Sequence, residues 1–300
     1  MGPVPLQTTV EVKEERLREA LAELPSLIVA LSGGTDSAYL AWVATQALGS
    51  RAVSVTAVSA SLPESERRGV EEFVRRHGIR HQFITTDELA NPLYVVNSPD
   101  RCYYCKDELF AKLDALAGEL DVTAVAYGVN VDDQGDFRPG QQAAREHRVL
   151  TPLLDAGLTK AEIRELSRQA GLETWDKPAA ACLASRLAPG IAVTEDNLKK
   201  VERAEDALRA LGFRQIRVRY HAPDDSGKAG QPFRVDNAVV PPGPLGPEGL
   251  VRIEIATDEL ARALTPEMAA KIRDALKPLG FKFITLDLEG YRQGSFNPQR

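Results

Sequence analysis

The chain has 300 residues, of which 43% are hydrophobic and 27% charged, a composition typical of a folded globular protein with a substantial core. A formal net charge of −6 argues against a protein that binds a long nucleic acid backbone. We find no apolar run of ~20 residues and no signal segment, so we expect a cytoplasmic protein without a membrane partner. Three cysteines are too few for a disulfide framework.

The first half of the chain alternates between apolar strands and amphipathic helices. The pattern predicts helices at 12–24, 37–48, 64–77, about 107–116 and 160–170, and strands at 27–31, 52–58, 82–85 and 122–127. Such βαβ units close right-handedly into a parallel sheet that is covered by helices. The sequence therefore predicts an α/β domain over residues 1–172, with its ligand at the carboxyl ends of the strands.

A glycine-containing turn follows the first predicted strand and precedes a helix. It comprises the glycines Gly33 and Gly34, the hydroxyl residues Ser32, Thr35 and Ser37, and the carboxylate Asp36. A strand, a glycine turn and a helix N-terminus form an arrangement in which backbone N–H groups converge on an anion. Hydroxyl groups can donate to phosphate oxygens, and Asp36 can bind Mg²⁺ beside a phosphate or cap the helix. The combination favours phosphate binding over a plain capped turn.

The loop after the fourth predicted strand, residues 128–136, contains Asn130 and three carboxylates. Because the carboxyl ends of parallel strands meet at one edge of a sheet, we expect this loop to lie near the phosphate turn. It is a candidate magnesium or ribose site, although acidic glycine-containing turns are also common on protein surfaces.

The SGGTDS turn resembles the signature of the PP-loop ATP pyrophosphatases, which bind the pyrophosphate of ATP and leave AMP on their substrate. The lysine-bearing G-x-x-x-x-G-K-[ST] loop occurs nowhere in the chain. The resemblance implies ATP and Mg²⁺ as cofactors and a catalytic role for Asp36. It also implies that the six turn residues and Asn130 bind the nucleotide.

After Gly171 the composition changes, and the elements become smaller. We predict a helix at 195–211, strands at 215–220, 251–256 and 281–288, and a helix at 266–276. Prolines and glycines are dense between the first two of these strands, which predicts a long loop without regular structure. The sequence thus indicates a second, smaller α+β domain over residues 173–300, with a loop insertion at 221–250.

All three cysteines have distinctive surroundings: Cys102 and Cys105 form a C-x-x-C pair before a predicted helix, and Cys182 lies in an alanine-rich turn. Such a pair places two sulfurs within reach of one metal centre, and a distant third cysteine can complete the set. No histidine has a ligand-like spacing from a cysteine, whereas a four-iron cluster held by three thiolates keeps one iron open. A redox pair and buried thiols are the alternatives.

Three stretches, WDKPAAACLASR at 175–186, GVNVDDQGDFRPG at 128–140 and EGYRQGSFN at 289–297, resemble the LarE family of nickel-pincer cofactor biosynthesis. The resemblance spans nearly the whole chain. It implies adenylation of a pyridinium dicarboxylate mononucleotide, delivery of sulfur to give a thiocarboxylate, and a homo-oligomer. In one type of this family the cysteine that matches Cys182 gives up its own sulfur. In the other, three cysteines hold a [4Fe-4S] cluster, and Cys102, Cys105 and Cys182 resemble that type, with sacrifice of Cys182 still open.

The implied substrate carries a phosphate and a second carboxylate, so basic side chains are expected around it. Residues two apart on a strand share a face, which groups Arg217 with Arg219. A strand carboxylate, Glu254, is a candidate for binding metal or orienting an arginine. The remaining candidate substrate ligands are Ser185, Arg186 and Arg292. Each arginine taken alone is equally well explained as a solvated surface charge.

Three other functions fit the same phosphate turn. A tRNA thiolase usually adds a nucleic-acid-binding module, and no basic stripe or zinc-ribbon spacing is visible. An amidating ligase with an N-terminal cysteine glutaminase is excluded by Met1-Gly2, but one that uses free ammonia is not. A non-catalytic sensor of ATP or of a cluster would bind without turnover. Release of AMP and pyrophosphate with substrate present separates these hypotheses.

Overall fold

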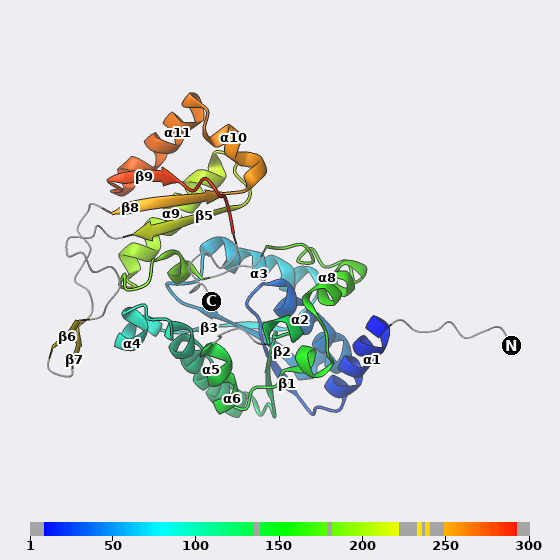
Figure 1. Ribbon diagram of the computed structural model, residues 1–300. Helices are drawn as coiled ribbons and strands as arrows, with labels where there is room; N and C mark the ends of the chain where they lie inside the picture. Colours follow the sequence, from blue (N-terminus) through cyan, green and yellow to red (C-terminus); the bar gives the residue numbers. More distant parts are fainter. Residues whose placement is uncertain are drawn as a thin grey trace, which may run out of the picture. The chain divides into compact units, whose positions relative to one another are not determined.

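The computed structural model describes residues 9–134, 139–178, 182–221, 233–235, 238–240 and 249–292 (Figure 1). Contacts divide the chain into two compact units. The first unit comprises Met1–Ser59, Glu64–Thr86 and Cys102–Ala180, and the second comprises Ala60–Pro63, Asp87–Arg101 and Ala181–Arg300. The second unit therefore includes two short segments from the first half of the chain. The division at residue 172 that we draw from the sequence stays a prediction.

The first unit contains a four-stranded sheet in the order β3-β2-β1-β4, and every pairing in it is parallel. The strands are β1 (Leu27–Ala30), β2 (Ala52–Val58), β3 (His81–Thr85) and β4 (Val125–Tyr127). All four residues of β1 are buried, as expected for a parallel strand that is covered on both faces. The predicted α/β class with a parallel sheet is confirmed.

Helices cover both faces of this sheet (Figure 1). They are α1 (Thr9–Ala22), α2 (Thr35–Leu48), α3 (Glu64–Arg76), α5 (Arg101–Leu120), α6 (Pro139–Glu146), α7 (Pro152–Asp155) and α8 (Lys160–Gln169). Side chains alternate along β1, so Leu27 and Val29 belong to the core under α1, α2 and α8. Ile28 belongs to the core under α5 and α6, together with Phe110.

Helix α5 begins earlier than the sequence pattern predicts. Its first residue is Arg101, whose N–H donates to the carbonyl oxygen of Ser98 at 3.0 Å. The C-x-x-C pair therefore lies in the first turn of the helix, and our expectation that it precedes the helix was wrong. A Ser-Pro pair directly upstream, at Ser98 and Pro99, is a helix-start signal that the apolar periodicity does not include.

The second unit is an α+β arrangement with a three-stranded sheet in the order β5-β8-β9. Its strands are β5 (Ile216–His221), β8 (Leu250–Ile255) and β9 (Phe283–Leu286), and its helices are α4 (Pro92–Val95), α9 (Glu195–Ala210), α10 (Leu260–Ala263) and α11 (Pro266–Leu276). β5 is antiparallel to β8, and β8 is parallel to β9. The predicted smaller α+β part is therefore present.

Part of the proline-rich insertion forms regular structure. β6 (Phe233–Val235) and β7 (Ala238–Val240) pair as an antiparallel ladder. Our prediction of a loop without regular structure is wrong for these six residues. The other residues between 222 and 248 lie outside the described part of the chain.

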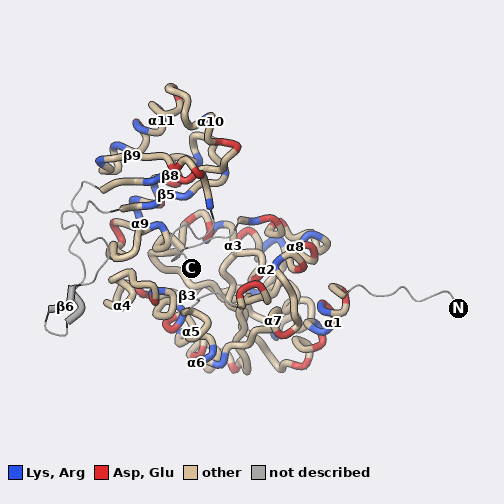
Figure 2. Tube along the Cα trace, in the orientation of Figure 1, with Lys and Arg blue, Asp and Glu red and all other residues tan. Residues whose placement is uncertain are grey.

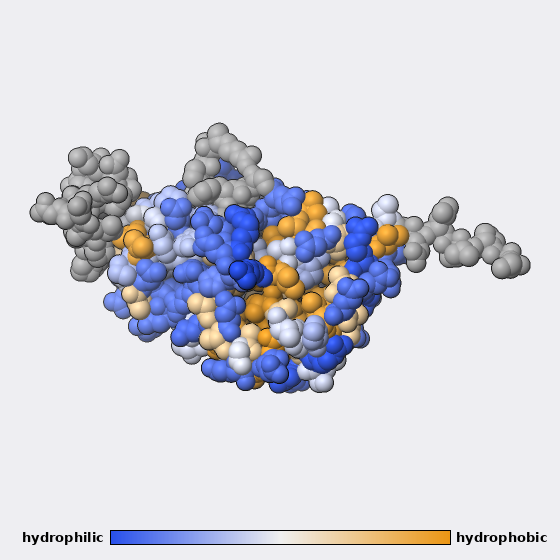
Figure 3. All heavy atoms as spheres, turned by 90° about the horizontal axis from the view of Figure 1, so that it is seen from below, coloured by the Kyte–Doolittle hydropathy of each residue, from blue (hydrophilic) through white to orange (hydrophobic). Residues whose placement is uncertain are grey.

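Acidic and basic residues are interspersed along the Cα traces of both units (Figure 2). On the face shown in Figure 3, hydrophilic side chains surround an apolar area. The 20-residue helix α5 carries charged side chains along its length. Among the described residues, none of the helices combines the length and the apolar character needed to cross a bilayer.

Candidate active site

Two loops meet beside β1 and β4, which are neighbours in the sheet. The chain leaves β1 toward β2 and β3, and then returns to the other side of β1 as β4, which makes this edge a topological switch point. A Cβ atom on Gly128, after β4, would lie 2.7 Å from the backbone nitrogen of Ser37 and 2.9 Å from the carbonyl carbon of Asp36. Glycine is therefore required for the second loop to approach the phosphate turn.

The phosphate turn is held in shape by the helix α3 and by Lys177, in the segment after α8. Gly33 has φ +78°, and a Cβ atom there would lie 2.8 Å from Cγ2 of Val70 on α3. Lys177 donates from Nζ to the carbonyl oxygen of Gly33 at 2.9 Å and to Oε2 of Glu66 at 2.7 Å. The turn therefore depends on a backbone conformation that favours glycine and on a lysine that is 144 residues away in the sequence.

Several hydroxyl groups of the turn are engaged within the protein. Ser37 Oγ accepts from the backbone N–H of Ser32 at 3.1 Å and donates to the carbonyl oxygen of Gly34 at 3.1 Å. Thr35 is 2% exposed, and its hydroxyl donates to the carbonyl oxygen of Thr174 at 2.8 Å. These hydroxyls stabilise the turn, and direct nucleotide binding by them stays a prediction.

Asp36 lies in the first turn of α2, and its two carboxylate oxygens differ in their hydrogen bonding. Oδ2 accepts from Nζ of Lys160 at 2.6 Å. Oδ1 is buried and has no hydrogen-bond partner among the described residues. A buried, unpartnered carboxylate oxygen is costly unless it binds a ligand, and it suits a hard cation such as Mg²⁺. Asp36 therefore fits the magnesium ion that the sequence resemblance implies.

Lys160 is the first residue of α8, and sequence reasoning missed it. The helix begins with a capping box in which Thr159 and Glu162 exchange hydrogen bonds. The backbone N–H of Lys160 donates to Oδ2 of Asp132 at 2.7 Å, and Asp132 N–H donates to Oδ1 of Asn130 at 2.9 Å. The T-x-x-E pattern signals this helix start, but nothing in the sequence indicates that Lys160 contacts Asp36.

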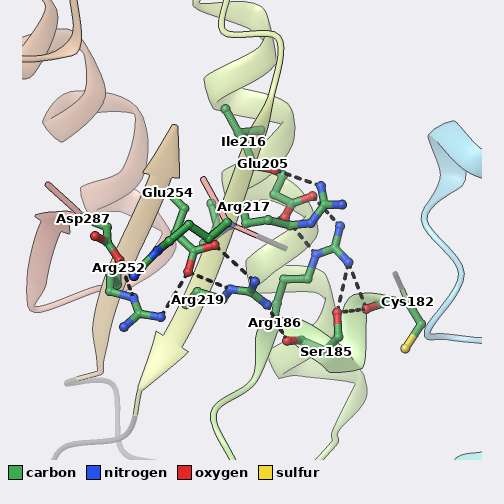
Figure 4. Close-up of polar contacts among 12 residues, drawn as sticks. Cys182, Ser185, Arg186, Glu205, Ile216, Arg217, Arg219, Arg252, Glu254 and Asp287 are labelled. Carbon is green, nitrogen blue, oxygen red and sulfur yellow. Dashed lines mark hydrogen bonds and ion pairs between the residues drawn. The ribbon is translucent and has the colours of Figure 1, made fainter. Parts of the chain in front are cut away.

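The second unit contains a buried group of charges that we call the arginine cluster. Its members are Arg186, Arg209, Arg217, Arg219 and Arg252, with the carboxylates of Glu205, Glu254 and Asp287 (Figure 4). With Asp206, the second carboxylate partner of Arg209, these five guanidinium groups meet four carboxylates, so the described cluster has a surplus of one positive charge. A positive surplus in a buried environment suits an anionic ligand.

The most buried ion pair of the cluster joins Arg186, 3% exposed, to Glu205, 1% exposed. Nε donates to Oε1 at 2.9 Å and Nη2 donates to Oε2 at 3.2 Å. Burial opposes both charges, but the pairing outweighs it, so the pKa of Glu205 is lowered and the pKa of Arg186 is raised. Arg186 also donates from Nη1 to the carbonyl oxygen of Cys182 at 3.0 Å, while Cys182 Sγ points away from it (Figure 4).

Arg219 on β5 and Glu254 on β8 are diagonal neighbours on paired strands, since Arg219 lies opposite Arg252 and Glu254 lies opposite Arg217. Nε of Arg219 donates to Oε1 of Glu254 at 3.1 Å, and Nη1 donates to the carbonyl oxygen of Ser185 at 2.9 Å. Arg252 also donates to Oε1 of Glu254 at 3.1 Å. These contacts place Ser185, Arg219 and Glu254 in one network, with Glu254 acting as an arginine partner.

The two remaining candidate substrate ligands, Arg217 and Arg292, differ in exposure. The guanidinium of Arg217 lies 5.2 Å from the ring centroid of Tyr291, and its pKa is lowered by burial and then by the nearby Arg186. Arg292 is 47% exposed and forms ion pairs with Asp287 and Glu289. Arg217 is thus a buried cation beside a like charge, while Arg292 is a largely solvated one.

None of the three cysteines, all of them among the described residues, is in a disulfide bond. Cys102 and Cys105 lie one turn apart on α5 in the first unit, and Cys182 precedes a short 3₁₀ turn in the second. Within the described residues, no group of three or more histidine, cysteine, aspartate or glutamate side chains is arranged to hold a metal ion. Neither unit by itself brings the three cysteines together. A shared cluster therefore stays a prediction.

The parallel sheet, its switch point and the glycine turn define an α/β protein of the PP-loop type. No family model matches the chain. It is 30% identical to the pyridinium-3,5-bisthiocarboxylic acid mononucleotide synthase of Lactiplantibacillus plantarum, over 96% of this chain and 95% of that protein. The chain therefore belongs to the family of this synthase, the LarE family that the sequence stretches resemble.

Two other relatives extend the comparison. An uncharacterized protein of Synechocystis sp. is 38% identical over 96% of this chain and 98% of its own length. An uncharacterized protein of Methanocaldococcus jannaschii is 25% identical over 89% of this chain and 90% of its own length. Both similarities extend over both units, so they are not confined to the phosphate turn.

Proposed function

We propose that the protein is an ATP-dependent sulfur transferase of nickel-pincer cofactor biosynthesis. It adenylates a carboxylate of a pyridinium mononucleotide and converts it to a thiocarboxylate. The observation that carries this proposal is the 30% identity, over nearly the whole length of both chains, to a synthase named for such a product. The geometry of the phosphate turn and the charge of the arginine cluster support it.

The nucleotide half of the reaction uses the first unit. Backbone N–H groups of the turn and of the α2 N-terminus bind the phosphates, and Asp36 binds Mg²⁺ through its unpartnered Oδ1. When bound, the metal ion neutralises charge on the phosphate oxygens. A substrate carboxylate oxygen attacks the α-phosphorus, the bond from that phosphorus to the bridging oxygen breaks, and pyrophosphate leaves with the electron pair.

The substrate half uses the arginine cluster. The surplus of guanidinium groups binds the phosphate and the second carboxylate of the mononucleotide. Arg217 gains most from an anion, because burial and the neighbouring Arg186 disfavour its charge in the free protein. Ser185, Arg219 and Glu254 position these groups through the network described above. Arg292 contributes from the exposed border.

Sulfur reaches the activated carboxyl group by one of two routes. In the first, the Cys182 thiolate attacks the activated carboxyl carbon and AMP leaves with the electron pair of the broken C–O bond. Loss of the Cys182 α-proton and cleavage of its Cβ–S bond then release the thiocarboxylate and leave dehydroalanine. In the second, Cys102, Cys105 and Cys182 hold a [4Fe-4S] cluster, which when bound supplies sulfide as the nucleophile. The spacing of Cys102 and Cys105, one turn apart on α5, supports two of these ligand positions.

The proposal is tested by measuring AMP and pyrophosphate release with ATP and a pyridinium dicarboxylate mononucleotide. We expect Asp36→Asn to lower this release about 100-fold or more, because it removes the negative charge that holds Mg²⁺ beside the phosphates. Glu72→Gln on α3, whose carboxylate is 59% exposed, is the matched control and should leave it unchanged. ATP binding without turnover by the wild-type protein would refute the proposal and indicate a sensor. Turnover only with tRNA or ammonia would indicate a thiolase or an amidating ligase.

The two sulfur routes differ in what happens to Cys182. Intact mass spectrometry after turnover should show loss of the Cys182 sulfur in the first route only. Iron content of anaerobically prepared protein should be lost in Cys102→Ala and in Cys105→Ala in the second route only. A homo-oligomeric state and a cytoplasmic location also stay predictions.

A further inference from the structure

We propose that Thr56 and His81 are positioning residues for the phosphate turn. Their side chains form a chain of hydrogen bonds that fixes the peptide group between Leu31 and Ser32, where the chain passes from β1 into the turn. The inference deepens the proposed function and rests on it, because the nucleotide half of the reaction depends on the shape of the turn. Both residues act through the backbone of the turn and not through contact with the substrate.

The first observation is a pair of hydrogen bonds that runs across β3, β2 and the end of β1, which are neighbours in the sheet. Thr56 on β2 is 2% exposed, and its hydroxyl donates to the carbonyl oxygen of Leu31 at 2.7 Å. Nε2 of His81, the first residue of β3, lies 2.9 Å from the same hydroxyl oxygen. A threonine hydroxyl has only one proton, and Leu31 receives it, so His81 must donate from Nε2 to Thr56.

The surroundings of His81 suit this role. Burial lowers the pKa of His81 to about 4, so at pH 7 the ring is neutral and carries a single N–H. The ring also packs at 83° to the ring of Phe83, with 4.5 Å between the centroids, which limits its rotation. Because the Nε2–H occupies the acceptor side of the Thr56 hydroxyl, the hydroxyl proton is directed to Leu31.

The second observation is that the same peptide group is held from its other side. The N–H of Ser32 donates to Oγ of Ser37 at 3.1 Å. The carbonyl oxygen and the N–H of one planar trans peptide point in opposite directions, so contacts at both ends fix its plane. The preceding peptide is fixed as well, because the N–H of Leu31 donates to the carbonyl oxygen of Val55 at 2.8 Å. The chain therefore enters the turn in one orientation.

The chain of contacts continues to the start of α2. Ser37 Oγ donates in turn to the carbonyl oxygen of Gly34 at 3.1 Å. That carbonyl belongs to the same peptide group as the N–H of Thr35, one of the first N–H groups of α2, which have no acceptor within the helix. Hydrogen bonds that are aligned from donor to acceptor polarise one another. Fixing and polarising these peptide groups strengthens the N–H groups that bind phosphate oxygens in the proposed reaction.

The first test measures amide hydrogen exchange over residues 32–37 by mass spectrometry, without nucleotide. Thr56→Val keeps the shape of the side chain and removes its hydroxyl, so exchange in the turn should become about tenfold faster. Thr56→Ser keeps the hydroxyl and should stay within about threefold of the wild-type rate. Thr45→Val on α2 is the matched control, since it removes a hydroxyl contact to the carbonyl oxygen of Ala41 at 2.8 Å and should leave the turn unchanged. Unchanged exchange in Thr56→Val would overturn the inference.

The second test measures pyrophosphate release with ATP and a pyridinium dicarboxylate mononucleotide. We expect Thr56→Val to lower kcat about tenfold while KM for ATP changes less than about threefold, because the N–H groups interact most strongly with the charge of the transition state. Thr56→Ser should keep most of the rate, and Thr45→Val all of it. If Thr56→Val were less stable to heat but had the wild-type kcat, its role would be structural only and the inference would be wrong.

His81 is tested by a second pair of variants, which also serves if Thr56→Val does not fold. His81→Gln places an amide N–H near the position of Nε2, so turn exchange and kcat should stay within about threefold of the wild-type values. His81→Leu fills a similar volume without a donor, and we expect it to lower kcat about fivefold. Equal losses in the two variants would overturn the role given to the Nε2–H of His81.

The outcomes separate this inference from the proposed function. If the wild-type protein releases pyrophosphate and Thr56→Val does so equally fast, the positioning role fails although the proposed function holds. If the wild-type protein releases none with any substrate, the proposed function fails, and the role of Thr56 in adenylation fails with it. The exchange measurement involves no turnover, so it still decides whether Thr56 fixes the turn.

Discussion

The buried ion pair between Arg186 and Glu205 allows a quantitative prediction. Glu205→Gln keeps the shape of the side chain and the acceptor for the N–H of Val218, which lies 3.2 Å from Oε1. It removes the charge that balances a guanidinium group only 3% exposed. Removing one partner of a buried pair costs about 3–5 kcal/mol, because the other charge is left uncompensated. Since one backbone contact survives, we expect a loss of about 3 kcal/mol in the free energy of unfolding.

The loss is measured by urea denaturation at pH 7, with far-UV circular dichroism as the probe. Trp42 and Trp175 both belong to the first unit, so tryptophan fluorescence reports separately on the unit without the substitution. The matched control is Glu267→Gln, whose carboxylate is 80% exposed in an ion pair with Lys271 on α11. That exposed pair should cost less than about 1 kcal/mol.

A cost below about 1 kcal/mol for Glu205→Gln would refute the reasoning, since it would mean that Arg186 finds compensation elsewhere. A double variant checks the cause of the loss. Combining Glu205→Leu with Arg186→Met removes both charges and restores apolar packing, so it should be more stable than Glu205→Gln. If it were the least stable of the three proteins, the charge argument would be wrong.

Two further predictions concern stability. Gly33→Ala should cost about 2 kcal/mol or more, because alanine is strained at φ +78° and its Cβ would meet Cγ2 of Val70 at 2.8 Å. Gly34→Ala should cost under about 1 kcal/mol, because φ is −81° there and the Cβ would only make an ordinary contact with Ser32 Oγ at 3.7 Å. Equal costs in thermal denaturation would contradict this. Burial lowers the pKa of His81 from 6.5 to about 4. Because the unfolded chain then binds a proton more readily than the folded protein, the free energy of unfolding is highest above pH 6.5 and decreases as the pH falls toward 4. Relative to His81→Gln, the wild-type protein should lose up to about 2 kcal/mol between pH 6.5 and 5, and a pH-independent difference in urea titrations would argue against it.

Local patterns were sufficient to predict much of the fold. The predicted strand 27–31 and helix 37–48 differ from the observed bounds of β1 and α2 by at most two residues, because strand and helix periodicities are properties of neighbouring residues. The period of two along a strand groups Arg217 with Arg219, and Glu254 on the neighbouring strand lies opposite the first and accepts a hydrogen bond from the second. The start of α5 was missed because the buried face of this helix begins only at Leu109, so its first turns carry no aliphatic period.

Contacts between distant parts of the sequence were not predictable in this way. Lys160 reaches Asp36 across 124 residues and Lys177 reaches Gly33 across 144, and no local pattern encodes either pairing. The partner of Arg186 was missed for a related reason. Glu205 is a carboxylate in the middle of an amphipathic helix, where a solvated position is the usual expectation, and only the packing of α9 on β5 buries it.

The division of the chain into units has a consequence for its synthesis. Asn97 donates its side-chain amide to the carbonyl oxygens of Leu187 and Ala188, and the N–H of Leu183 donates to the carbonyl oxygen of Ser61. An emerging polypeptide thus exposes residues 60–63 and 87–101 long before the ribosome delivers their partners. A truncated chain that ends after the sheet of the first unit would leave both segments without their partners. Folding of the second unit is therefore completed only after the C-terminal part of the chain has been synthesised.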